Sequence, residues 1–154
     1  MRHLAKKGIL TELNEDLVSF FEGEKLVMLS TIDHESQAPN VSAISWVKCL
    51  DKNNIRFSVT TNSRTIQNVK ENPHVVFTII GLETVYSIHG SASILEDAMK
   101  GVSLKLAKIN VTVNQVLETM FWGAKITTEP EYEKTYNQKK AEELDKEVYE
   151  SLLK

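Results

Sequence analysis

The chain has 154 residues, of which 42% are hydrophobic and 25% are charged, and its formal net charge is -3. This length predicts one domain over 1–154 with a core that needs neither disulfide nor metal, and the composition excludes a disordered or collagen-like chain. Residues 1–128 carry equal numbers of acidic and basic side chains, so the net charge belongs to 129–154. Nucleic acid is not an expected partner, because phosphate backbones require a concentrated basic surface.

The apolar stretches of the chain are too short to cross a membrane. The stretch 75–82 falls well below the roughly 18 residues that a membrane span needs. Residues 1–8 carry positive charge but no apolar segment follows them, so no secretory signal is predicted. Cys49 stands alone, which excludes an internal disulfide and is typical of a reducing compartment. We expect a cytoplasmic protein in which Cys49 is a core residue.

The first part of the chain predicts a helix and three strands. Apolar side chains at spacings of three and four predict a helix over 11–22, ended by Gly23. Segment 25–32 is apolar on both alternating faces, which is typical of a strand packed on two sides. Alternating patterns predict further strands over 41–49 and 55–59. We expect these three strands to form a meander.

The middle of the chain predicts a short helix between strands. Ser63 can cap a helix over 63–71, and strands follow over 74–80 and 84–95. Gly90, in the middle of the second of these strands, predicts a bend or bulge.

The last part of the chain predicts a hairpin and a helical tail. Segments 104–113 and 116–122 can pair as a hairpin, and a capping box at 128–131 predicts the start of a helix. The buried stripe of this tail helix, 129–154, is Ala141, Leu144, Val148 and Leu152. The predicted fold class is mainly β (α+β), a closed or nearly closed barrel over 26–122 with small helices and a C-terminal helix.

The motifs of common enzyme classes are missing from the sequence. The four histidines lack metal-ligand spacing and there is one cysteine, so no metal site is predicted. Serine-hydrolase, P-loop and Rossmann motifs are also missing. His89 shares a strand face with Ser87 and Ser91, and a structural role is the preferred interpretation over a catalytic one. No catalytic residue is assigned.

Segment 60–65, Thr-Thr-Asn-Ser-Arg-Thr, is a candidate anion site because it follows a strand and opens a helix. Backbone N–H groups at a helix start, several hydroxyls and the Arg64 guanidinium can together hold a phosphate. A simple helix cap by Ser63 is the alternative interpretation.

Five segments between residues 26 and 96 form a recognisable series: LVMLSTID, APNVSAISWV, IRFSVTTNSRT, NVKENPHVVFTII and VYSIHGSASILED. In order and spacing they resemble the FMN-binding split-barrel family typified by pyridoxamine 5'-phosphate oxidase. The resemblance implies a homodimer with FMN in clefts at the subunit interface, the isoalloxazine against the second and third strands and the phosphate near the short helix. The implied cofactor-binding residues are Ser42, Ala43, Ile44, Ser58, Val59, Thr60, Ser63, Arg64 and Thr65.

The chain departs from the family pattern at its basic positions. Thr65 stands where most relatives have a lysine, Ser42 replaces an arginine, Val47 a lysine and Val85 a glutamine. Arg64 alone remains of the basic set, so FMN phosphate should bind less tightly than in the relatives. The chain also ends without the extension that holds pyridoxamine phosphate, so we do not expect that oxidase's own activity.

Two functional hypotheses follow from the resemblance. The first is a flavin-dependent oxidoreductase or flavin carrier that acts on an unidentified small molecule. The second is a non-enzymatic ligand-binding barrel with a degenerate flavin site, holding haem through His89 or another small molecule. An oligonucleotide-binding barrel fits worst, because its third strand offers only Phe57 and Arg56. For the aromatic residues at 120–122, packing on the C-terminal helix is preferred to stacking of Trp122 on a bound ring.

Overall fold

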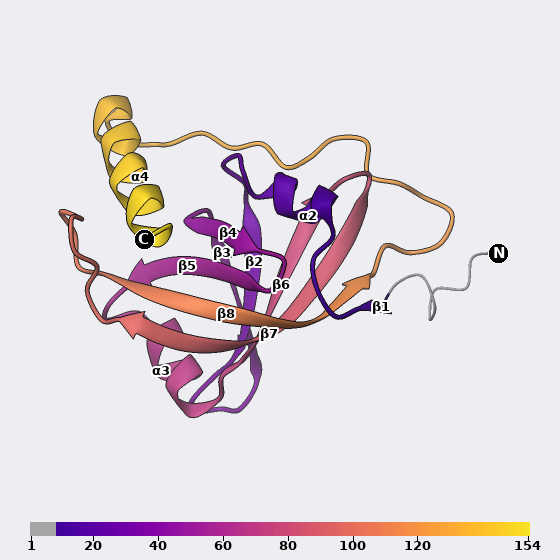
Figure 1. Cartoon of the computed structure of the whole chain (residues 1–154), viewed down its shortest axis with the longest axis horizontal. Coiled ribbons are helices and arrows are strands. Elements are labelled where there is room, and N and C mark those ends of the chain that lie inside the picture. Colours follow the sequence, from indigo (N-terminus) through magenta and orange to yellow (C-terminus); the bar gives the residue numbers. More distant parts are fainter. Residues whose placement is uncertain (1–8) are drawn as a thin grey trace.

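The computed structural model describes residues 9–154, so the predicted lack of a signal segment at 1–8 lies outside the described residues. Strands dominate this part of the chain, and three helices accompany them (Figure 1). In chain order the elements are β1 (Ile9–Leu10), α2 (Glu15–Phe20), β2 (Val27–Ile32), β3 (Pro39–Ile44), β4 (Val47–Asp51), β5 (Asn54–Thr60), α3 (Arg64–Glu71), β6 (His74–Gly81), β7 (Thr84–Glu96), β8 (Leu106–Glu118) and α4 (Gln138–Leu152).

The strands form one antiparallel sheet that is rolled up. Its order is β3-β2-β6-β7-β8-β5-β4, and β1 pairs with β8 outside this path. Strands β3 and β4 therefore lie at opposite ends of the sheet, yet only Ser45 and Trp46 connect them. Because two residues cannot span an open seven-strand sheet, the two ends must come together. The predicted barrel is thus confirmed.

Two strand predictions were wrong around this connection. The segment 41–49 is not one strand but parts of β3 and β4, and the three strands do not form a meander. Strand β3 pairs with β2, whereas β5 pairs with β4 and β8. The chain turns sharply because Val47 N–H donates to the carbonyl of Ser45 and Ser58 N–H donates to the carbonyl of Trp46. The alternation of side chains continues through Ser45 and Trp46 in the sequence, so periodicity alone cannot show that the chain turns there.

The predicted hairpin over 104–113 and 116–122 was also wrong, because β8 runs without a break through Asn114 and Gln115. Strand β7 is equally long and pairs with β8 along almost its full length, from Tyr86 opposite Glu118 to Glu96 opposite Lys108. The predicted irregularity at Gly90 is confirmed as a register shift between His89 and Gly90. Long neighbouring strands satisfy more backbone groups than a short hairpin would.

The helix boundaries differ from the sequence predictions. The first helix is shorter than 11–22, because Asn14 caps it by accepting a hydrogen bond from Leu17 N–H. The tail helix begins at Gln138 and not in the capping box, and Asn137 is its N-cap. Glu129 of that box instead pairs with Lys25 Nζ at 2.8 Å. Segment 119–137 therefore crosses the barrel as irregular chain before α4 begins (Figure 1).

The barrel interior holds the main core. Phe57 and Phe77 meet edge to face there, with ring centroids 5.8 Å apart. Leu17 of α2 is buried in the same cluster. A second cluster lies under α4, where the predicted stripe is largely confirmed: Ala141, Val148 and Leu152 are buried and Leu144 is half-buried. Within residues 9–154, no helix is both long and apolar enough to cross a membrane.

Candidate functional site

A cavity of about 490 Å³ lies where β3, β5 and the start of α3 meet. Its volume is within the range of roughly 300 to 1,000 Å³ that is typical of small-molecule sites. The corner between β3 and β4 forms part of the wall, and the segment before α4 closes another part. The lining residues are Ser42, Ala43, Ile44, Ser45, Trp46, Ser58, Val59, Thr60, Ser63, Thr65, Lys134 and Tyr136.

The cavity brings together eight of the nine residues that the family resemblance implies. The ninth, Arg64, does not line it. The sheet order explains how two distant segments meet. Strands β3 and β5 are not adjacent in the sheet, but the two-residue corner closes the barrel and turns both strands toward one space. The start of α3 follows β5 after a short turn, in which Ser63 N–H donates to the carbonyl of Thr60 at 2.9 Å.

Two buried hydroxyl groups in this cavity have no hydrogen-bond partner among the described residues. They are Ser58 Oγ and Ser63 Oγ. Ser63 occupies the N-cap position of α3, but its side chain makes no capping hydrogen bond. The capping alternative thus does not account for this hydroxyl. Because an unsatisfied buried polar group costs about 1 to 3 kcal/mol, both serines fit a polar ligand in the cavity.

Helix α3 is held in place by a buried amide. Asn68 is fully buried, and its Nδ2 donates to Thr31 Oγ1 at 3.0 Å. The amide oxygen of Asn68 accepts from the backbone N–H of His34 at 2.9 Å. Thr31 belongs to β2 and His34 to the turn that follows it, so the helix is fixed against this end of the sheet. Sequence reasoning missed Asn68 because a single asparagine on a short helix carries no motif.

Arg64 lies at the helix start but does not line the cavity. Its guanidinium donates to both carboxylate oxygens of Asp33, at 2.5 and 3.0 Å, and to Glu35 Oε1 at 3.1 Å. These bonds, together with hydrogen bonds from Ser36, hold the pKa of Asp33 well below its usual range. The charge of Arg64 is therefore offset by two carboxylates on the turn after β2.

The Asp33 carboxylate should stabilise the fold in a pH-dependent way. A lowered pKa gives stabilisation that is complete above the ordinary value of 3.8 and is lost as the pH falls toward the folded-state value. We expect the unfolding free energy of the wild type to fall more steeply than that of Asp33→Asn between about pH 5 and about pH 2. Urea denaturation of both proteins across this range measures the difference. Parallel pH curves would contradict the prediction.

Lys134 and Tyr136 complete the cavity from the segment that precedes α4. Lys134 Nζ lies 3.0 Å from Asp145 Oδ2 and 3.6 Å from Glu24 Oε2. Asp145 also accepts a hydrogen bond of 2.8 Å from Trp46 Nε1, so α4, the corner and this segment share one carboxylate. Sequence reasoning missed Lys134 and Tyr136, because it placed them in the tail helix over 129–154 and no spacing links them to β3 or β5.

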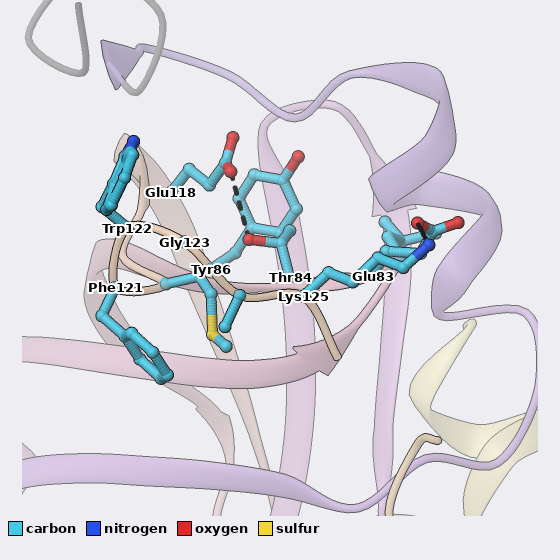
Figure 2. A pocket seen from close by; sticks show the side chains of 11 residues that line it. Glu83, Thr84, Tyr86, Glu118, Phe121, Trp122, Gly123 and Lys125 are labelled. Atoms are coloured by element: carbon cyan, nitrogen blue, oxygen red, sulfur yellow. Dashed lines mark hydrogen bonds and ion pairs between the residues drawn. The ribbon is translucent and has the colours of Figure 1, made fainter. Parts of the chain in front are cut away.

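A second cavity, of about 480 Å³, lies beside the ends of β7 and β8. Figure 2 shows Phe121 and Trp122 projecting on one side of it and Tyr86 and Glu118 on another. The predicted packing of these aromatic residues on the C-terminal helix was wrong, since Phe121 is 71% and Trp122 77% exposed. Helix α4 packs against Leu106, Met99 and Trp46 instead, so its apolar face is already covered.

The remaining candidate residues lie outside the first cavity. His89 lines a separate cavity of about 280 Å³ on the outer side of β6 and β7, together with His74. Cys49 packs against the main core, and burial raises the pKa of its thiol to about 11, which agrees with the predicted core role. Within residues 9–154, no group of three or more His, Cys, Asp or Glu side chains could hold a metal ion.

The fold and the cavity define the class of protein: a split β-barrel with a cavity between two strands and a helix start. A family model for pyridoxamine 5'-phosphate oxidase matches residues 13–121. The chain belongs to the pyridoxamine 5'-phosphate oxidase family. The match covers every strand from β2 to β8 and ends before Lys134 and Tyr136.

Solved structures share this fold at low sequence identity. A protein from Lactobacillus delbrueckii provisionally assigned as a pyridoxamine 5'-phosphate oxidase has a TM-score of 0.59 and 19% identity, over 70% of this chain and 99% of its own. An F420 reductase has a TM-score of 0.57 and 20% identity, over 68% and 98%. HutZ, the haem storage protein from Vibrio cholerae, has a TM-score of 0.52 and 15% identity, over 70% and 96%. No curated protein matches the chain.

Proposed function

We propose that this chain binds FMN in the cavity between β3, β5 and α3 and acts as a flavin-dependent oxidoreductase on a small molecule. One observation carries the proposal: eight residues that the family resemblance assigns to FMN line a single cavity, and two of them present unsatisfied buried hydroxyls. When bound, FMN would supply hydride or electron transfer. The protein would orient the ring and keep water from it.

Different residues of the cavity would hold the ring and the phosphate of FMN. Backbone groups of β3 and β5, from Ser42 to Ile44 and from Ser58 to Thr60, would face the isoalloxazine. Ser63, Thr65 and the first N–H groups of α3 would hold the phosphate, since a helix start leaves such donors without intrahelical partners. Arg64 would add charge at longer range, reduced by its pairs with Asp33 and Glu35.

We also propose a homodimer, with each cavity completed at the subunit interface. Strand β3 lies at one end of the sheet order, and its Val41 is 56% exposed. An exposed edge strand with apolar side chains needs protection, and a second copy would supply it. The contacts of α4 with Trp46 and Leu106 support one domain over the whole chain. Light scattering on the purified protein gives the oligomeric state, and a monomer at all concentrations would contradict the dimer.

The proposed function predicts a direct binding result. Titrating the purified protein with FMN should quench flavin fluorescence to saturation, because Trp46 and Tyr136 line the cavity and aromatic side chains beside an excited flavin quench it by electron transfer. Ser63→Ala should weaken binding by about tenfold, since it removes one hydrogen bond to a charged phosphate. Ser19→Ala, at an exposed position of α2 outside the cavity, is the control and should bind like the wild type. Absence of quenching by the wild type would overturn the proposal.

The ligand-binding alternative gives a different spectrum. A haem barrel would show a Soret band with added hemin, lost in His89→Ala. The structure favours this less, because His89 lies outside the first cavity and its own cavity measures about 280 Å³. The same titration with hemin in place of FMN therefore separates the two functions.

A further inference from the structure

Lys134 is the only charged side chain among the described residues that line the first cavity. It lies in the segment between β8 and α4, outside residues 13–121 that the family model matches. The family's basic positions carry Thr65 and Ser42 here, and both of these also line the cavity. A cation thus returns to the cavity from a different part of the chain.

The position of this ammonium is fixed from two sides. Asp145 of α4 is nearly buried and pairs with Lys134 Nζ at 3.0 Å, while Glu24 lies 3.6 Å away. Burial lowers the pKa of Lys134, but the hydrogen bond to Asp145 and the charges of Asp145 and Glu24 outweigh it, so the pKa is raised. The side chain is 19% exposed. Lys134 therefore stays protonated and has little freedom to move.

Lys134 lies beside the corner between β3 and β4, whereas the helix start follows Thr60 at the end of β5. Lys134 shares Asp145 with Trp46, which places it beside this corner. Ser63 and Thr65 belong to the start of α3, and the corner lies beside Ser58 of β5, whose N–H donates to the carbonyl of Trp46. With the phosphate at α3, a ligand that extends along β5 brings its ring toward Lys134.

We propose that Lys134 contacts the ring of bound FMN and makes its reduction more favourable. The inference rests on the proposed function. Reduction adds electrons and negative charge to a flavin, and an ammonium beside the ring stabilises that charge. Asp145 and Glu24 offset part of the charge of Lys134, but unlike Arg64 this residue lines the cavity itself. The contact is a property of this chain's tail and not of the matched barrel, since Lys134 follows the matched residues.

The test uses the full chain and three variants: Lys134→Gln, Lys134→Arg and Lys139→Gln. Lys139 is an exposed residue of α4 outside the cavity and serves as the control. FMN affinity is measured by fluorescence quenching, and the potential of the bound flavin by redox titration against a dye. Thermal unfolding shows whether each variant folds.

We expect Lys134→Gln to bind FMN about tenfold more weakly and to shift the potential to a more negative value. Lys134→Arg should stay close to the wild type on both measures, as should Lys139→Gln. If Lys134→Gln weakens binding but leaves the potential unchanged, Lys134 only holds the segment in place and the inference is overturned. An unchanged affinity and potential would also overturn it. A wild type that binds no FMN would instead refute the proposed function itself.

Discussion

Ala43→Trp is expected to weaken FMN binding by about 100-fold or more, because the added indole would occupy the space assigned to the ring. Ala43 lines the cavity from β3, and its small side chain is exposed. The substitution therefore adds volume to the cavity and not to the core. Thermal unfolding should stay near that of the wild type, while the fluorescence titration with FMN should show no saturation.

Leu95→Trp is the control for this variant. Leu95 is an exposed residue of β7 and does not line the cavity. It should bind FMN like the wild type. If Ala43→Trp binds FMN with the wild-type dissociation constant, the flavin must lie elsewhere and the site assignment is wrong.

Gly90→Ala is expected to lower the free energy of unfolding by about 2 to 3 kcal/mol. A Cβ at this position would lie 2.4 Å from Val111 Cγ1 and 2.6 Å from the carbonyl oxygen of Thr112. The second contact is with backbone of β8, which cannot move without disturbing its pairing with β7. Urea denaturation measures the loss.

Gly23→Ala is the control for the glycine variant. The nearest atom to a Cβ there is Lys25 Cε at 3.7 Å, the end of a flexible side chain. Its unfolding free energy should change by less than about 0.5 kcal/mol. A loss of the same size in both variants would mean that general glycine effects, and not the close approach of two strands, explain the result at Gly90.

The order of the elements could be predicted from the sequence, but their connections could not. Alternation identified β5 and β7, segments apolar on both faces identified β2 and β6, and the bulge at Gly90 followed from one residue. The corner at Ser45 and Trp46 was missed, because its two turns depend on hydrogen bonds within the folded chain. The same applies to β8, whose length is set by its partner β7.

The cavity residues on the strands could be predicted from the sequence, whereas those in the segment before α4 could not. Ser42 and Ser58 follow from the resemblance, since they belong to the matched segments. Lys134 reaches the cavity only through pairs with Asp145 and Glu24, residues that lie 11 and 110 positions away. Capping signals misplaced the start of α4 because Glu129 pairs with Lys25 instead. Long-range ion pairs of this kind leave no periodic trace in a sequence.

The division of the cavity between barrel and tail has a consequence for how such proteins diversify. The strands that carry Ser42 and Ser58 are bound into the barrel, so changes there threaten folding. Segment 119–137 pairs with no strand beyond its first residues and contributes Lys134. Chimeras that exchange this segment between relatives should therefore alter ligand preference while the scaffold stays intact. Selection can change the side chains that segment 119–137 contributes to the cavity without changing the barrel strands that form the rest of it.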